Sequence, residues 1–217
     1  MKAIGLELYK LRHKRLLLMV TLFLFVEIAW AFMAASMSIS RNPNNAEWEM
    51  LIALLSSMNG LFLPILTAIC VSRICDMEHK GNTWKLLLTF SVKRSTLYAA
   101  KYISASIIML VACLLQALSI IAFGIINGFK QPVPLILLIR FLIGMVLTNM
   151  VITALQQWVS MAVKNQAFAL SLGMIGGFIG LAADLFPAGV RRIFVWSCYT
   201  GLSPVTQSYA DEKIQFI

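Results

Sequence analysis

Long apolar runs alternate with short polar breaks along this chain, and the alternation predicts its architecture. A bilayer with a hydrocarbon core of roughly 30 Å requires about 20 consecutive apolar residues in a helix. Five windows of that length qualify, and they lack the period-two alternation of a membrane β-strand. The predicted spans cover about residues 16–37, 50–71, 98–126, 133–161 and 167–186. We therefore expect an all-α integral membrane protein, a polytopic helical bundle with five visible spans.

The composition agrees with a chain that folds in lipid. Hydrophobic residues make up 60% of its 217 positions, charged residues make up 12%, and the mean hydropathy is +0.84. Soluble domains carry about 25% charged residues, so the composition excludes that class. Because the polar breaks are short, residues 1–217 are expected to form a single transmembrane domain.

The net charge of +9 could indicate a nucleic-acid-binding protein, but the basic residues gather at the ends of the predicted spans. Segment 1–15, segment 73–101 and Lys164 hold 12 of the 18 Lys and Arg residues, all on one side of the predicted bundle. The positive-inside rule makes that side cytoplasmic. We therefore predict a cytoplasmic N-terminus, an extracytoplasmic segment at residues 187–217 and no nucleic-acid partner.

The segment before the first span has an amphipathic pattern. Ile4, Leu8 and Leu11 share one helical face, whereas Lys10 and Lys14 share another. Residues 1–15 are therefore expected to form a basic helix lying flat at the inner interface of the membrane. The alternative is a disordered basic head that only fixes the topology.

The final segment leaves the number of spans open. Its apolar patch at residues 193–199 is too short to cross a bilayer, and hydrophobicity returns at residues 214–217. Residues 187–217 either form an external tail of a five-span protein or lead into a sixth span.

The loop between the second and third spans carries the most informative sequence. Residues 78–101 read EHKGNTWKLLLTFSVKRSTLYAAK. A helix beginning at the Asn-Thr pair would place Trp84, Leu87 and Leu88 on one face, and that pair could cap its start. An apolar stripe on the cytoplasmic side needs a partner. The stripe either rests on the membrane surface or inserts into a groove of a soluble protein.

The same string resembles the signature loop of ABC-2 type export permeases. In that family an acidic residue, Gly-x-Thr, a Leu-rich turn and an Arg ahead of a Tyr and a Lys follow the second span. The core at residues 82–85 is most similar to the permease subunits of lantibiotic and related peptide-antibiotic immunity exporters. The likeness extends to the basic N-terminal segment and the order of spans. The chain differs in having Ser91 where those permeases usually have Pro, and five visible spans where six are expected from the family.

This resemblance implies a multi-pass permease of the bacterial plasma membrane, without an enzymatic site of its own. It would couple ATP hydrolysis on a separate subunit to outward removal of an amphipathic peptide antibiotic or a similar hydrophobic compound. The implied partners are two copies of an ABC ATPase subunit and a second permease, identical or homologous. The chain contains no G-x-x-x-x-G-K-[ST] phosphate loop, so ATP and Mg²⁺ are expected on the partner ATPase.

The resemblance also implies that the loop is a cytoplasmic coupling helix that contacts the ATPase. The residues expected at this contact are Glu78, Gly81, Thr83, Trp84, Lys85, Leu87, Leu88 and Arg94.

Polar side chains inside the spans are a second set of candidates, since ionisable groups at membrane depth usually face a partner or a wet cavity. Glu27 lies near the middle of the first span, Asn59 in the second, and Arg140 and Asn149 in the fourth. These four are candidate residues of a substrate pathway, and Glu27 could pair with Arg140. The alternatives are snorkelling of Arg140 to the outer interface and a protonated, hydrogen-bonded structural role for Glu27.

The fifth predicted span is rich in small residues. Gly173, Gly176, Gly177 and Gly180 form overlapping G-x-x-x-G spacings that let another helix approach closely. The pattern predicts helix packing, either within one subunit or across a dimer.

An alternative function is a non-transport membrane protein, such as an intramembrane enzyme or a sensor scaffold. The four cysteines lack the short paired spacings of a zinc site and are expected to be buried thiols, with no metal site. No predicted span offers a paired His and Glu or two carboxylates at matching depth. The transport function is therefore preferred.

Overall fold

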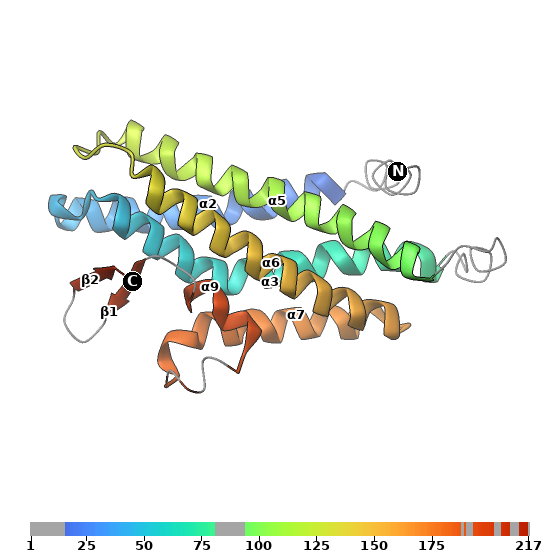
Figure 1. Cartoon of the computed structure of the whole chain (residues 1–217). Helices are drawn as coiled ribbons and strands as arrows, with labels where there is room; N and C mark the ends of the chain where they lie inside the picture. The colour runs from blue at the N-terminus through green and yellow to red at the C-terminus, as the bar shows by residue number, and fades with distance from the viewer. Residues whose placement is uncertain are drawn as a thin grey trace.

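The computed structural model describes residues 16–80, 94–187, 189, 193–201, 205–208 and 213–216. Within these residues, long helices run side by side in alternating directions (Figure 1). They are α2 (Leu16–Arg41), α3 (Trp48–Lys80), α5 (Arg94–Ile126), α6 (Leu135–Ala162) and α7 (Gln166–Leu181). Four of them, α2, α3, α5 and α6, are long and apolar enough to cross a membrane. The prediction of a polytopic helical membrane protein is confirmed.

The fifth predicted span differs from its expected form. Helix α7 has 16 residues, about 24 Å at the rise of an α-helix, and it ends at Leu181 instead of continuing to residue 186. The 3-10 helix η2 (Ala182–Leu185) follows, and Pro187 lies two residues beyond it. Proline is common just after a helix because it cannot continue the backbone hydrogen bonds. The apolar composition of residues 167–186 therefore overstated the length of this helix.

Helix α3 is the central helix of the bundle and contacts α2, α5, α6 and α7. In its most apolar stretch 61% of the residues are buried, compared with 28% in α2. Pro64 lies inside α3 without ending it. A proline is tolerated in a membrane helix where neighbouring helices surround the freed backbone group.

The first turn of α3 is fixed by contacts with the α5–α6 connection. The indole Nε1 of Trp48 donates a hydrogen bond to the carbonyl of Gln131 over 3.0 Å. Its ring meets Phe129 edge to face, with 5.1 Å between the centroids, and covers Gly124. Gly128 has φ +64°, the left-handed conformation that glycine adopts without steric cost. This glycine lets the chain leave α5 tightly enough to deliver the connection to Trp48.

A short segment returns into the bundle after α7. The 3-10 helix η3 (Val195–Ser197) and the one-turn helix α9 (Cys198–Gly201) contact α3, α6 and α7. Figure 1 shows α9 beside the middle of the long helices. Irregular backbone at membrane depth is stable only where protein or a cavity surrounds it. Packing against three helices meets that requirement here.

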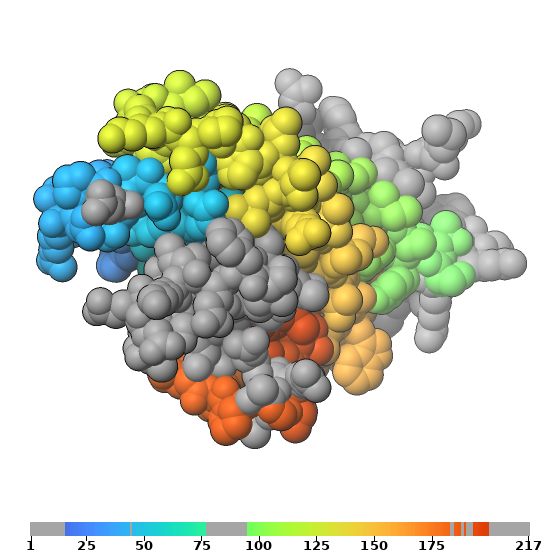
Figure 2. All heavy atoms as spheres, turned by 60° about the vertical axis from the view of Figure 1, so that its left-hand side comes forward, coloured from blue at the N-terminus to red at the C-terminus, as the bar shows by residue number. Residues whose placement is uncertain are grey.

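Two short strands follow the returning segment. Strands β1 (Val205–Ser208) and β2 (Lys213–Phe216) pair antiparallel, with Val205 opposite Phe216. Strand β1 contacts α3. The strands lie near the end of the bundle that carries the α2–α3 and α5–α6 connections (Figure 1). Figure 2 turns this end forward, with the α5–α6 connection above the α2–α3 connection and the end of α7 below.

Candidate functional site

Buried polar side chains from five helices gather inside the bundle. The set, called the polar core below, consists of Glu27, Asn59, Thr67, Gln116, Asn149 and Tyr199, and none of them is more than 4% exposed. They come from α2, α3, α5, α6 and α9. Polar groups buried at membrane depth are costly and are often functional, so the polar core is the candidate site.

One half of the polar core joins α5, α3 and α6. The amide Nε2 of Gln116 donates a hydrogen bond to Oδ1 of Asn59 over 2.9 Å. The Nδ2 of Asn59 in turn donates to Sδ of Met145 over 3.0 Å. Each polar atom of the Asn59 amide thus has one partner, on α5 for the oxygen and on α6 for the nitrogen.

Glu27 of α2 lies beside Gln116 in the same half. The carboxyl of Glu27 interacts with the side chain of Gln116, but among the described residues neither its two oxygens nor Oε1 of Gln116 has a partner in ideal hydrogen-bond geometry. A neutral carboxyl can donate to that amide oxygen, whereas a carboxylate can only accept. A carboxylate buried here would carry a large desolvation cost.

The other half is centred on Asn149 of α6. Its Oδ1 accepts hydrogen bonds from the hydroxyl of Tyr199 over 2.7 Å and from Oγ1 of Thr67 over 3.3 Å. Its Nδ2 donates to Sγ of Cys113 over 3.3 Å. One side chain thus connects α6 with α3, α5 and the returning helix α9.

The structure places three of the four predicted pathway residues together. Glu27, Asn59 and Asn149 belong to the polar core, where Gln116, Thr67 and Tyr199 join them. Gln116 was missed although it interrupts an apolar run in the same way as Asn59. Tyr199 gave no signal, because its position depends on the return of a segment that hydropathy places outside the membrane.

Glu27 and Arg140 do not form the pair that the sequence allowed. Arg140 is exposed on the outer surface of α6, whereas Glu27 is fully buried beside Gln116. Arg140 lies five residues after Leu135, within about 8 Å of the start of α6. A long side chain at that position can reach the interface by snorkelling. The hydropathy pattern places both residues in predicted spans but does not show the directions in which they point.

The four glycines of α7 are buried at contacts within this chain. Gly173 faces Ala68 of α3, Gly177 faces the carbonyl of Leu61, and Gly180 faces the backbone of Gly60. Gly176 instead lies under the ring of Trp196 in η3. Small residues on α7 therefore admit both α3 and the returning segment.

The predicted coupling helix falls outside the described residues. Gly81, Thr83, Trp84, Lys85, Leu87 and Leu88 all belong to residues 81–93. Glu78 lies in the last turn of α3, and Arg94 is the first residue of α5. Figure 1 shows these two helix ends at the same end of the bundle, opposite β1 and β2.

The buried carboxyl of Glu27 leads to a testable prediction. Replacing Glu27 with Gln is expected to raise the free energy of unfolding by about 1 kcal/mol, since an uncharged amide avoids the cost of burying a carboxylate and can donate to Oε1 of Gln116. The apparent melting temperature in detergent measures this. Glu27→Ala is the comparison, because loss of the buried chain should lower stability by about 2 kcal/mol. A Gln variant as unstable as the Ala variant would contradict this description of the site.

Comparison with known proteins assigns a family. The family model described as ABC-2 family transporter protein matches residues 3–180, which include all five long helices up to the last turn of α7. No curated protein matches the chain. The resemblance found in the loop sequence therefore agrees with a match over most of the chain. The chain belongs to the ABC-2 transporter family, as a membrane permease subunit that works with an ABC ATPase.

Proposed function

We propose that this chain is one of two permease subunits in a bacterial exporter that moves an amphipathic peptide antibiotic of the lantibiotic type outward from the plasma membrane. A similarly hydrophobic compound is included in the proposed cargo. The second permease is identical or homologous to this chain, and two ATPase subunits bind ATP and Mg²⁺. Residues 81–93 form the coupling helix on the cytoplasmic side.

The length of α3 is the observation that carries the coupling assignment. The apolar stretch ends near Val71, yet α3 continues through the exposed Arg73 to Lys80. Nine further residues extend a helix by about 14 Å. Helix α5 likewise begins at Arg94, before the predicted apolar stretch. The described ends of α3 and α5 on either side of residues 81–93 thus extend past the predicted apolar stretches, where a soluble ATPase would have access. This favours docking on a protein over rest on the membrane surface.

The proposed cargo has a different support. The similarity of residues 82–85 to lantibiotic-immunity permeases favours an amphipathic peptide. The polar core adds hydrogen-bonding groups at the centre of an otherwise apolar bundle. A transporter of amphipathic molecules can use such groups when its helices separate.

The coupling assignment predicts that Trp84→Ala and Leu87→Ala release the ATPase. Buried aromatic anchors at an interface contribute about 2 kcal/mol or more, which corresponds to roughly 30-fold weaker binding. The measurement is a pull-down of the permease in mild detergent with its partner ATPase, followed by ATP hydrolysis in the recovered complex. Trp30→Ala is the matched control, because Trp30 is 54% exposed in α2, away from the coupling end.

Two results would contradict parts of the proposal separately. Equal ATPase recovery with wild type, Trp84→Ala and Leu87→Ala would remove residues 81–93 from the ATPase interface. The cargo is identified by measuring ATP-dependent uptake into inside-out vesicles that contain the complete transporter. The vesicles are supplied with a fluorescent lantibiotic or a fluorescent phospholipid. ATP-dependent uptake of the phospholipid alone would reject the peptide cargo and leave the coupling assignment in place.

A further inference from the structure

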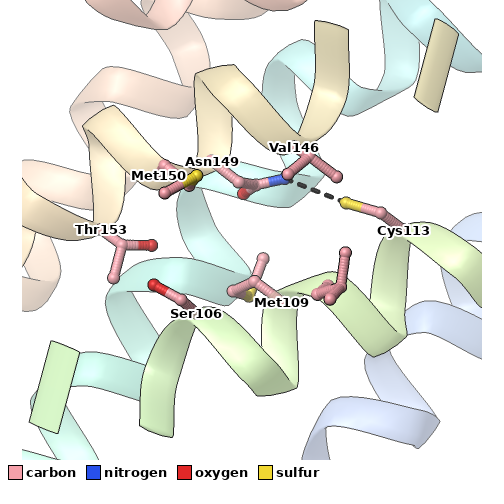
Figure 3. A pocket seen from close by; sticks show the side chains of 8 residues that line it. Ser106, Met109, Cys113, Val146, Asn149, Met150 and Thr153 are labelled. Atoms are coloured by element: carbon pink, nitrogen blue, oxygen red, sulfur yellow. Dashed lines mark hydrogen bonds between the residues drawn. The ribbon is translucent and has the colours of Figure 1, made fainter. Parts of the chain in front are cut away.

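A small recess opens between α5 and α6 on the exposed apolar side of the bundle. Ser106 and Leu110 line it from α5, and Met150 and Thr153 line it from α6 (Figure 3). Leu110 and Met150 are each 42% exposed, so the recess opens toward the surroundings of the bundle. Its enclosed space has room for about one water-sized group.

Two hydroxyl groups face this space without a partner. Thr153 is fully buried, and neither its Oγ1 nor the buried Oγ of Ser106 makes a hydrogen bond. Figure 3 shows the two oxygens turned toward one another from the two helices. An uncompensated hydroxyl in apolar surroundings is costly, so a group that bonds to both would be stabilised there.

Neighbouring hydroxyls on the same helices behave differently. Ser104 donates to the carbonyl of Ala100 over 2.9 Å, and Thr148 donates to the carbonyl of Gly144 over 2.8 Å. Bonding to the preceding helical turn is the usual way for serine and threonine to be satisfied within a helix. The hydroxyls of Ser106 and Thr153 are therefore distinguished by facing the recess.

The inner wall of the recess is closed by Asn149 and Cys113. The Nδ2 of Asn149 donates to Sγ of Cys113, and its Oδ1 is occupied by Tyr199 and Thr67. Among the side chains that line the recess, the two hydroxyls are therefore the polar groups that have no partner among the described residues. Among the described residues, no charged side chain lines the recess, which favours an uncharged ligand.

The surroundings suit an acyl chain. Exposed apolar residues border the opening on both helices, including Ile107 and Leu114 of α5 and Leu147 and Val151 of α6. Ser106 lies twelve residues after Arg94, about 18 Å along α5 from its start. The recess is therefore well inside the bilayer, where a charged headgroup is disfavoured.

We propose that this recess binds the uncharged hydroxyl or amide group of a bilayer amphiphile whose acyl chain lies along the apolar faces of α5 and α6. The ligand accepts and donates hydrogen bonds at Ser106 and Thr153. It reaches the recess laterally from the membrane. This inference goes beyond the proposed function and does not depend on a peptide cargo.

Photolabelling of the permease in phospholipid nanodiscs tests the proposal. The probe is a diacylglycerol with a diazirine in one acyl chain, and the comparison probe has hydrogen in place of the free hydroxyl. We expect labelled peptides from α5 and α6 with the first probe and much weaker labelling with the second. Removing both hydroxyls with Ser106→Ala and Thr153→Val should lower labelling about tenfold, because two membrane hydrogen bonds are lost.

The control variant combines Ser104→Ala with Thr148→Val, which removes the same groups from the same helices outside the recess. It should keep wild-type labelling. Ser106→Ala alone, expected to lower labelling about threefold, is the second variant if the double substitution impairs folding. Equal labelling of wild type and the recess variants would overturn the proposal, as would even labelling of α2, α5 and α6. A recess that only holds water predicts those results.

Comparing photolabelling with and without the partner ATPase and ATP distinguishes two sources of the ligand. A resident lipid is labelled equally with and without turnover. A transported molecule leaves the recess during turnover, and its labelling falls. Either result retains the site and assigns its occupant to one of these two sources.

Discussion

Replacing Gly180 with valine is expected to prevent recovery of the folded protein. Gly180 of α7 meets the backbone of Gly60 in α3, and a Cβ on Gly60 would in turn lie 2.8 Å from the carbonyl oxygen of Gly180. Backbone atoms cannot move aside as a flexible side chain can. Helices packed this closely must separate to admit a side chain, at a cost of about 3 kcal/mol or more, because overpacking disrupts every neighbouring contact.

The measurement is the monodisperse fraction in size-exclusion chromatography after extraction, followed by the apparent melting temperature. Gly189→Val is the matched control, since no described residue comes within 4 Å of a Cβ at Gly189. Gly180→Ala should give an intermediate loss. Wild-type recovery and melting temperature for Gly180→Val would show that α3 and α7 do not pack through this contact.

Substitution of Asn149 by leucine is the second large effect expected. It removes hydrogen bonds to Tyr199, Thr67 and Cys113 and leaves two buried hydroxyls without their acceptor. Membrane hydrogen bonds contribute about 0.6 kcal/mol on average, and each stranded buried hydroxyl adds a desolvation cost. We expect a loss of about 3 kcal/mol in the free energy of unfolding.

A double-mutant cycle separates this network from a simple packing defect. Tyr199→Phe alone should cost about 1 kcal/mol, because it removes one hydrogen bond. In the Asn149→Leu background the same change should cost almost nothing, since the acceptor is already absent. Asn127→Leu is the control, because Asn127 bonds only locally to Phe123 and is exposed. Additive effects of Asn149→Leu and Tyr199→Phe would contradict a shared network.

The sequence predicts the course of the helices better than their ends. Hydropathy detects the apolar part of α3 near residues 50–71, but the helix continues to Lys80 because backbone hydrogen bonds also form between polar residues. For α7 the predicted helix is too long. The apolar composition extends past Leu181, where the backbone changes to a 3-10 helix. Hydropathy thus measures contact with lipid, whereas helix ends depend on local backbone chemistry.

The candidate site was predictable where a polar residue interrupts an apolar run. Asn59 and Asn149 stand out in that way, and both lie in the polar core. Arg140 stands out equally but faces outward, because α6 presents Arg140 together with exposed Ile136 and Ile139. Tyr199 could not be foreseen, since its place is set by tertiary contacts of α9. Depth is encoded in the sequence, whereas direction requires the packed structure.

The close contact of Gly60 with Gly180 also has a mechanical consequence. The interlocked backbones resist sliding, so the parts of α3 and α7 around this contact should move together. Helix α3 is 33 residues long, about 50 Å, and its far end leads into residues 81–93. A displacement at that end would pass Pro64, where the helix lacks a backbone hydrogen bond, before it reaches Gly60. The returning segment would move together with α7, because Trp196 packs over Gly176.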